Sequence, residues 1–259
     1  MNLSFFIARR LGYKGRVVTG AVAVSFLVVI IAIAVSAGFR YEIRNGLSAL
    51  TGDVQLTMAD INYLDESSPV STEQAYLASV EDVEGVVSVS PVIYRAGIVK
   101  QDDEIYGVMI KGVEGGVRCA TGTDIPDTLA LAVSIPSSLA ERAQLGIGDK
   151  LLTYFVGDKV KVRQFNVADI YEPLVRTDDR HLVFADISDM QRLNGWTETE
   201  ATMFEVALED DYKERSKMDT VTYHILDAVL ENIAGEDDFL HLDPFVEKLR
   251  EGYDLVMGN

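Results

Sequence analysis

The sequence contains few of the residues on which small functional sites usually depend. It has one cysteine, Cys119, and three histidines among 259 residues. A single cysteine excludes an intrachain disulfide framework and a cysteine-cluster metal site. Basic residues are also scarce, because 23 Lys and Arg stand against 41 Asp and Glu, for a formal net charge of -18. This acidic balance argues against nucleic acid as the main partner.

Motifs for nucleotide binding and hydrolysis are missing as well. The chain has no G-x-x-x-x-G-K-[ST], no G-x-S-x-G and no H-E-x-x-H. The glycine-rich stretch 112–116 lacks the lysine that a phosphate-binding loop requires. We expect a loop there with no helix after it. A metal site at His241 would need convergent ligands that one histidine among acidic residues does not supply, so we expect a solvated charged face. We therefore predict no catalytic residue, no cofactor and no metal in this chain.

The charges that are present are distributed unevenly. The first sixteen residues hold no acidic residue and four basic ones: Arg9, Arg10, Lys14 and Arg16. The next charged residue is Arg40, so the rest of the chain carries 19 basic and all 41 acidic residues, for a net charge of -22. The uncharged stretch between them contains Val17–Ala37, which is almost wholly apolar or small.

The segment Val17–Ala37 is predicted to cross a membrane as a helix. Its 21 residues would span about 31 Å at about 1.5 Å per residue, which matches a bilayer's hydrocarbon core. The absence of a polar face over six turns disfavours a buried helix of a soluble protein. The four basic residues before it set the topology, because such residues favour the cytoplasmic side. We expect the protein in the cell (inner) membrane, with a cytoplasmic N-terminus and a periplasmic or otherwise extracytoplasmic main domain.

A cleaved signal peptide is the alternative for this segment. Ala34 and Ser36 could supply the small residues of a cleavage site. The apolar run is longer than the usual signal core of about 7–15 residues, which favours a retained helix. The residues after the run also favour it, since Phe39, Ile43, Leu47 and Leu50 recur at helical spacing. They predict that the helix continues as a stalk to about Gly52.

After Gly52 the sequence alternates strand and helix signals. Strands are expected at Val54–Met58, Val86–Val99, Ile105–Val113, Leu131–Ile135, Lys150–Val156, Val160–Tyr171, His181–Ala185 and Met203–Leu208. Helices are expected at Ser71–Val83, opened by a Ser-Thr-Glu-Gln capping box, and at Pro136–Leu145, Asp186–Leu193, Asp219–Ile233 and Pro244–Tyr253. The pattern predicts a mixed α+β domain. A division into two lobes near residues 114–130 is left open, and the polar loop 115–128, with Cys119, is expected to be exposed.

One turn in this domain is predicted in detail. Gly146 and Gly148 are expected to let the chain leave a helix at positive φ, and Asp149 to close the turn before the next strand. These three residues specify a fold and bind nothing by themselves.

Three stretches, in this order, resemble the FtsX-like class of ATP-binding-cassette permeases, which includes the lipoprotein-releasing LolC/LolE permeases and MacB. The first is FFIARRLGYKGR with the apolar run and SAGFRYEIRNGLSALTGDVQL, similar to the family's first transmembrane helix and stalk. The second is VSIPSSLAERAQLGIGDKLLTYFV, and the third is FNVADIYEPLVRTDDRHLVFADISDMQRLNGW. The pattern looks closest to the lipoprotein-releasing branch.

The resemblance implies a non-enzymatic permease subunit with a MacB-like periplasmic core domain. Its implied partners are a cytoplasmic ATP-binding subunit that hydrolyses ATP, a second permease subunit in a homo- or heterodimer, the membrane, and lipoprotein cargo or a periplasmic carrier. Its implied segments are 1–16 (basic N-terminus), 17–38 (transmembrane helix), 39–52 (stalk), 53–243 (core domain) and 244–259 (return segment toward a second transmembrane helix).

Two departures from the family keep alternatives open. The family has three further transmembrane helices after the outer domain, whereas this sequence ends at Asn259 with no second span. We therefore expect either that it is a piece of a longer chain or that it cannot transport by itself. VGDKVKVRQ also stands where the lipoprotein-releasing subunit has a long carrier-binding hairpin. The alternatives are a MacB-type efflux permease, a signal-anchored binding or adaptor module that acts without an ATPase, and an enzyme secreted after signal cleavage.

Overall fold

The computed structural model describes residues 3–57, 69–101, 104–124, 129–157, 159–173 and 181–233. The expected helix Pro244–Tyr253, the return segment 244–259 and the acidic stretch at His241 lie outside these residues. The chain divides into two compact units, Met1–Leu50 and Thr51–Asn259. We call the second the C-terminal unit.

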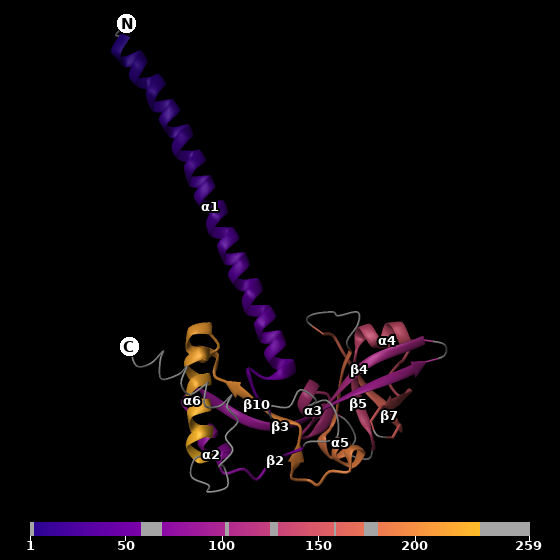
Figure 1. The fold of residues 1–259 in the computed structure, drawn as a ribbon. Coiled ribbons are helices and arrows are strands. Elements are labelled where there is room, and N and C mark those ends of the chain that lie inside the picture. Colours follow the sequence, from indigo (N-terminus) through magenta and orange to yellow (C-terminus); the bar gives the residue numbers. More distant parts are fainter. Residues whose placement is uncertain are drawn as a thin grey trace. The chain divides into compact units, whose positions relative to one another are not determined.

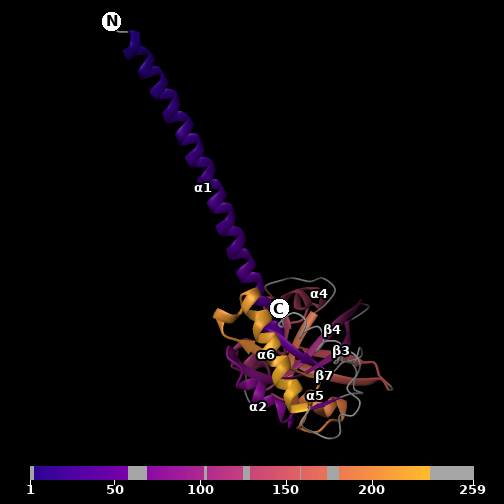
Figure 2. The ribbon, with the colours of Figure 1, turned by 60° about the vertical axis from the view of Figure 1, so that its left-hand side comes forward.

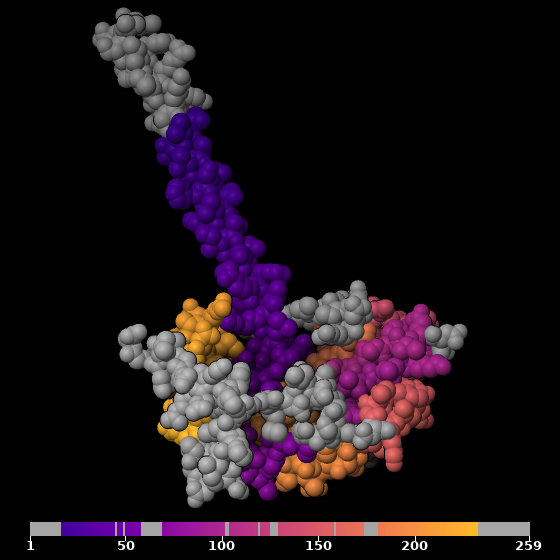
Figure 3. Space-filling model, in the orientation of Figure 1, coloured from indigo at the N-terminus to yellow at the C-terminus, as the bar shows by residue number. Residues whose placement is uncertain are grey.

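The first unit contains all but the last residue of the helix α1, which runs unbroken over Leu3–Thr51 (Figure 1). Within the described residues, Val17–Ser48 is the one stretch of helix long and apolar enough to cross a membrane, and its most apolar window of 18 residues has a mean hydropathy of 2.8. Its large side chains are exposed, for example Phe26 at 67% and Ile33 at 64%. Figure 3 shows the described part of this helix in space-filling form. The predicted span and the predicted stalk are therefore both helical, while the membrane topology stays a prediction.

The C-terminal unit is built on one sheet of eight strands in the order β1-β10-β3-β4-β8-β5-β7-β6. The strands are β1 (Val54–Thr57), β3 (Val86–Gln101), β4 (Glu104–Val113), β5 (Ala132–Pro136), β6 (Lys150–Phe155), β7 (Lys161–Tyr171), β8 (His181–Asp186) and β10 (Met203–Leu208). Two short strands, β2 (Val70–Ser71) and β9 (Glu200–Ala201), pair separately. The helices are α2 (Tyr76–Glu81), α3 (Gly116–Thr121), α4 (Ser137–Ala143), α5 (Ile187–Asn194), the 3-10 turn η1 (Asp210–Tyr212) and α6 (Arg215–Ile233).

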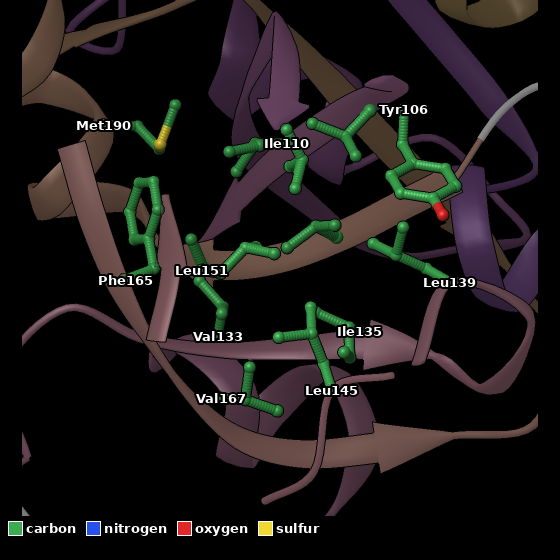
Figure 4. Packing of buried hydrophobic residues seen from close by; sticks show 14 of the residues in the cluster. Tyr106, Ile110, Val133, Ile135, Leu139, Leu145, Leu151, Phe165, Val167 and Met190 are labelled. Carbon is green, nitrogen blue, oxygen red and sulfur yellow. The ribbon is translucent and has the colours of Figure 1, made fainter. Parts of the chain in front are cut away.

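Six of these strands close into a barrel. The second half of β3 pairs with β4 along one edge and with β6 along the other, where Ile98 lies opposite Tyr154. The ring therefore runs β3-β4-β8-β5-β7-β6 and back to β3. Alternate residues of these strands point inward, and Ile110, Val133, Leu151 and Phe165 converge in the barrel interior (Figure 4). This packed interior is the main core of the unit.

The first half of β3 leaves the barrel and forms a second, smaller core. There Val86–Val92 pairs with β10, and β10 pairs with β1, which is the last strand of the sheet in the described residues. Helices α2 and α6 contact each other (Figure 2) and cover this extension through Val80, Val221 and Ile225. Both cores thus share the sixteen-residue strand β3.

The strand predictions are confirmed to within one or two residues at each end, and so are the helix predictions at α4 and α5. The helix predicted at α6 is also confirmed, but it starts four residues earlier than expected. Asp186 caps α5, because its Oδ1 accepts a hydrogen bond from Ser188 N at 2.9 Å. Trp196, the single tryptophan of the chain, packs against the barrel core. Alternating burial and clear end signals explain this success.

Three expectations are not confirmed. A helix, α3, follows the glycine-rich stretch 112–116, and its Val117 is buried. The capping box does not cap α2, which starts only at Tyr76, because Ser71 lies in β2 and Thr72 N donates to Thr199 O at 2.8 Å. Residues 114–130 do not separate two lobes, because β4 and β5 on either side of them belong to the same barrel.

Candidate functional site

A junction of two residues connects α1 to β1 near the start of the C-terminal unit. Helix α1 ends at Thr51 and β1 begins at Val54, so Gly52 and Asp53 alone form the connection. The contacts of these two residues decide how firmly the chain is attached at this point.

Asp53 is fastened to β10 by its main chain and its side chain. Its backbone N donates to Val206 O at 3.0 Å, and its Oδ2 accepts from Leu208 N at 2.9 Å. The Nζ of Lys213 lies 3.8 Å from the same oxygen, and the Asp53 side chain is only 3% exposed. A charged acceptor held in a buried site makes stronger hydrogen bonds than a neutral one. Asp53 therefore fixes the start of β1 against the neighbouring strand.

Gly52 allows the turn that brings Asp53 into this position. Its φ is +71°, a conformation that is costly for any residue with a Cβ. A Cβ placed there would also lie 2.9 Å from the Cβ of Glu205 on β10. Glycine is therefore required at the junction for both backbone and packing reasons, and its close neighbour is Glu205.

Glu205 belongs to a buried polar cluster that joins three adjacent strands. Its Oε2 accepts from Lys111 Nζ on β4 at 2.6 Å, and its Oε1 accepts from Tyr94 OH on β3 at 2.6 Å. The side chains of Lys111 and Glu205 are 4% and 10% exposed. Lys111 Nζ also lies 5.7 Å and 5.9 Å from the ring centres of Tyr94 and Phe184, within cation-π range. Contacts thus run from the junction through β10 and β3 to β4 and β8.

Burial changes the acid-base behaviour of this cluster. Loss of solvent lowers the pKa of Lys111, and the attraction and hydrogen bond of Glu205 oppose that lowering. A buried charge is stable only while its partner is present. The cluster therefore ties the three strands together as long as both charges remain.

The predicted turn around Gly146 is observed with one difference. Asp149 closes it by accepting from Gly146 N at 2.7 Å, and Gly148 has a φ of +93°. The left-handed residue at the end of α4 is Gln144, with a φ of +53°, whereas Gly146 is not among the described residues with positive φ. The turn is also tied to β7, because Gly148 N donates to Val167 O at 2.7 Å.

The other residues selected from the sequence all lie on α1. Arg9, Arg10, Lys14 and Arg16 lie in the helical turns before the apolar run, and Phe39, Ile43, Leu47 and Leu50 lie after it. Of the second group, Phe39 and Leu47 are exposed, at 67% and 48%. Their roles in topology and in the stalk stay predictions.

Catalytic and metal-binding chemistry finds little support in the part of the chain that the structure describes. No group of three or more His, Cys, Asp or Glu there could hold a metal ion. Ser138 Oγ and His181 Nδ1 lie 3.3 Å apart, but His181 is 3% exposed and packs edge-on against Tyr106. A nucleophile and its base must be reachable by a substrate, so this contact is better explained as part of the core.

The junction residue Asp53 and the cluster residues Glu205 and Lys111 were not predicted from the sequence. A signal for two of them exists, because Lys111 and Glu205 are single charges inside the apolar strand segments VMIKGV and MFEVAL. Charged residues inside strands with otherwise apolar neighbours are seldom buried without partners. The sequence does not reveal that these two charges face each other, because 94 positions separate them.

No protein-family model and no curated protein matches the chain. Among solved structures, it is similar to the extracellular domain of the ABC-type transporter YknZ from Gram-positive bacteria, with 13% identity and a TM-score of 0.42, over 71% of this chain and 95% of that one. It is similar to the periplasmic region of MacB from Actinobacillus actinomycetemcomitans, with 14% identity and a TM-score of 0.40, over 71% and 84%.

A third similar structure is a domain of a putative permease protein from Porphyromonas gingivalis, with 16% identity and a TM-score of 0.31, over 61% of this chain and 78% of that one. Because all three TM-scores lie below 0.5, these likenesses do not establish the family of the chain.

Proposed function

We propose that this chain is a membrane subunit of an FtsX-like ABC transporter and that it transmits movement from the membrane to the C-terminal unit. The observation that carries the proposal is the continuity of the backbone. Helix α1 runs unbroken from the apolar segment to Thr51, and Asp53, two residues later, is fastened to β10. Such an attachment suits a domain that α1 pulls or pushes. The resemblance of the three sequence stretches to these permeases supports the same function.

The contacts beyond the junction explain how a movement could spread. A displacement of Asp53 acts on β10 through hydrogen bonds of 3.0 Å and 2.9 Å. From β10 it reaches β3 and β4 through Glu205, Tyr94 and Lys111. Short, buried hydrogen bonds between rigid strands transmit a displacement better than exposed, flexible side chains do. The unit would therefore move as a body when α1 moves.

The resemblance supplies the remaining parts of the proposal. A separate cytoplasmic ATP-binding subunit hydrolyses ATP, and a second permease subunit completes the transporter. The N-terminus lies in the cytoplasm, and the C-terminal unit lies in the periplasm or outside the cell. The cargo that the pattern favours is a lipoprotein released from the inner membrane, and efflux of the MacB type is the alternative within the same class.

Co-purification from the native membrane tests this function. The full-length protein, tagged at its C-terminus, is extracted in a mild detergent, and its partners are identified by mass spectrometry. The proposal expects an ATP-binding-cassette subunit in comparable amount and vanadate-sensitive ATP hydrolysis. Purification without any ATPase contradicts the proposal and favours the anchored adaptor. An N-terminus that begins near Ser36 instead shows a cleaved signal peptide.

An insertion at the junction tests the transmission itself. A flexible Gly-Ser segment inserted after Thr51 lengthens the connection without removing any contact of α1 or of β10. We expect transport to be lost while the ATPase still binds and hydrolyses ATP. The matched control carries the same insertion after Val156, just beyond the end of β6, where transport should persist. Equal transport by both variants would contradict a transmitting junction.

A further inference from the structure

A groove of about 540 Å³ lies beside β1 in the C-terminal unit. The helices α2 and α6 contribute its other walls, with Tyr76 and Ile225 among their lining residues. All four residues of β1 line the groove, although successive side chains of a strand point to opposite faces. The main chain of β1 is therefore part of the wall. Because the inner edge of β1 is paired with β10, the groove runs along its outer edge.

The outer edge of β1 offers hydrogen-bonding groups of the main chain. Within the described residues, β1 is the last strand of the eight-stranded sheet. In a strand that is paired on one side only, every second residue directs its N–H and C=O away from the sheet. Such an edge can be extended by an added strand. A ligand without amides could fill the groove but would leave these groups unused.

The floor of the groove is apolar and its lining is uncharged. Val54 and Leu56 pack against the second core, and Ile225 is 1% exposed. A strand added beside β1 would place every second side chain next to these residues, and the others next to the exposed Gln55 and Thr57. None of the lining residues is charged, so an ionised side chain over the floor would lose its hydration without gaining a partner. The floor therefore selects apolar side chains at alternate positions.

The segments that form the helical walls are acidic outside the groove. Residues 69–84 contain four acidic residues and residues 219–233 contain three, and neither stretch contains a lysine or an arginine. The basic residues of α6, Arg215 and Lys217, lie in its first turn. Glu73 is next in sequence to the lining residue Gln74, and Asp219 lies one turn before Thr222 on α6. These exposed carboxylates favour basic residues on either side of an apolar peptide segment.

The walls of the groove are held in place without a ligand. Helices α2 and α6 pack together through Val80 and Val221. At the far end of α6, Asn232 Nδ2 donates to Ser79 Oγ at 2.9 Å. The third wall, β1, is held by its pairing with β10. A preformed site of this kind binds without a large ordering cost.

We propose that β1 and this groove bind an extended peptide segment of a partner protein, which adds a strand to the sheet. The segment has apolar side chains at alternate positions and lysine or arginine on both sides of them. The open edge recognises its main chain, the floor its apolar side chains, and the acidic walls its basic residues. The site lies within the C-terminal unit and goes beyond the proposed function, because it does not depend on an ATPase.

Crosslinking of a synthetic peptide to the full-length chain in uncharged detergent micelles tests the proposal. In the peptide, valine alternates with threonine, lysines flank both ends, and photo-leucine replaces a central valine. We expect adducts on β1 and on α6 between Thr222 and Val229. The same peptide with glutamates in place of the lysines should bind more weakly, and salt should reduce the difference. Adducts outside the groove only, or no adducts, would overturn the proposal.

Two N-methylated peptides separate strand addition from the burial of side chains. One is methylated at the amides of its valines and the other at those of its threonines, which face opposite edges of the added strand. Only one edge can pair with β1, so one isomer should lose affinity and the other should keep it. Each hydrogen bond is worth about a two- to tenfold change in affinity, so the loss of two should cost at least about fivefold. Equal affinities of the two isomers would overturn strand addition.

Two variants of the chain fill the groove from opposite walls, and one matched variant does not. Ala75→Trp and Thr222→Trp place an indole over the floor from exposed positions, so the fold is retained. Ala78→Trp places the same ring on α2 at an exposed residue that does not line the groove. Each buried methylene is worth about a fourfold change in affinity. Excluding even two should therefore weaken binding about tenfold or more in the first two variants and leave it unchanged in Ala78→Trp.

The remaining outcomes concern other occupants of the groove. Equal peptide binding by all three variants would overturn the groove as the site. Self-association of the chain that Thr222→Trp abolishes, together with no peptide binding, would overturn the proposal in favour of a second copy on the same edge.

Discussion

The buried cluster at Glu205 gives the sharpest energetic prediction. The change is Glu205→Gln, which keeps the shape of the side chain and removes its charge. In the wild-type chain both carboxylate oxygens accept, one from Tyr94 OH and one from Lys111 Nζ, each at 2.6 Å. Glutamine supplies one acceptor oxygen and puts an NH₂ group where the second oxygen was. Either the Tyr94 hydroxyl or the Lys111 ammonium group is therefore left facing the NH₂ group of the glutamine, which is itself a donor.

The magnitude follows from the burial of both partners. The side chains of Lys111 and Glu205 are 4% and 10% exposed, so water does not replace the lost contact. Removing one partner of a buried ion pair typically costs about 3–5 kcal/mol. Domains of this size have total stabilities of about 5–15 kcal/mol. The substitution should therefore remove a large part of the stability at neutral pH.

The loss should also depend on pH in a defined direction. Burial already lowers the pKa of Lys111, and the variant loses the Glu205 charge that opposes this. Between that lowered pKa and the ordinary lysine value of about 10.4, the unfolded chain binds the proton and the folded chain does not. The free energy of unfolding of the variant therefore rises with pH in this window. The substitution then costs less stability there than at neutral pH.

Urea unfolding of the full-length chain in detergent micelles measures these effects, with Trp196 fluorescence as the probe of the barrel. The control is the double variant Lys111→Met with Glu205→Gln, which no longer contains the buried cation and should be more stable than Glu205→Gln alone by about 1–3 kcal/mol. A loss below about 1 kcal/mol at pH 7, or no gain from the second substitution, would refute the assignment of a coupled buried pair.

Three further predictions concern the junction and a half-buried tyrosine. Asp53→Ala should cost about 1.5–3 kcal/mol, because a buried charged acceptor is lost, and urea unfolding measures this; a change within about 0.5 kcal/mol would show that Asp53 does not fasten β1. Gly52→Ala should cost at least about 1–2 kcal/mol from its positive φ alone, and an unchanged midpoint would contradict the strained turn and the close approach to Glu205. Burial raises the pKa of Tyr171, whose OH donates to Leu182 O at 2.8 Å, so the folded chain keeps a proton that the unfolded chain loses above about pH 10. The free energy of unfolding should therefore fall as the pH rises above about 10, and it should fall less steeply in Tyr171→Phe. Equal slopes in the two chains would disprove burial of Tyr171 as the cause.

The barrel strands could be predicted from the sequence because their signal is local. Segments such as KLLTYF and KVRQFNVADIY are rich in aliphatic and aromatic residues, and burial alternates along the first of them, where Leu151, Thr153 and Phe155 are buried; glycine or aspartate stands near the ends of both segments. Such a pattern sets the face of each residue but not its neighbour strand. The closure of the ring, which rests on Ile98 opposite Tyr154, depends on pairing across 56 positions and could not be read locally.

The errors have physical causes that single segments do not reveal. Ser71 has the spacing of a helix cap, but it pairs instead with Glu200 of β9, 129 positions later, and so lies in β2. The helix α3 is short and begins between two glycines in the left-handed conformation, Gly115 and Gly116, so propensity alone disfavours it. Its Val117 is buried, and tertiary packing decides the conformation.

The candidate site shows the same division between local and non-local information. The apolar run and the stalk spacing predicted where the helix lies, and Gly52 marked its end. The fastening of Asp53 to Leu208 could not be predicted, because it joins residues 155 positions apart.

The most direct test of a transmitting membrane subunit is a distance measurement across the assembled transporter. In a Cys119→Ser background, a nitroxide label at the exposed position Ile147 reports the separation of two C-terminal units in nanodiscs that contain the co-purified ATPase. Pulsed electron paramagnetic resonance should show different distance distributions without nucleotide and with ATP and vanadate, and the Gly-Ser insertion after Thr51 should abolish the difference while ATP hydrolysis continues. Identical distributions in both states, in a complex that hydrolyses ATP, would contradict the account.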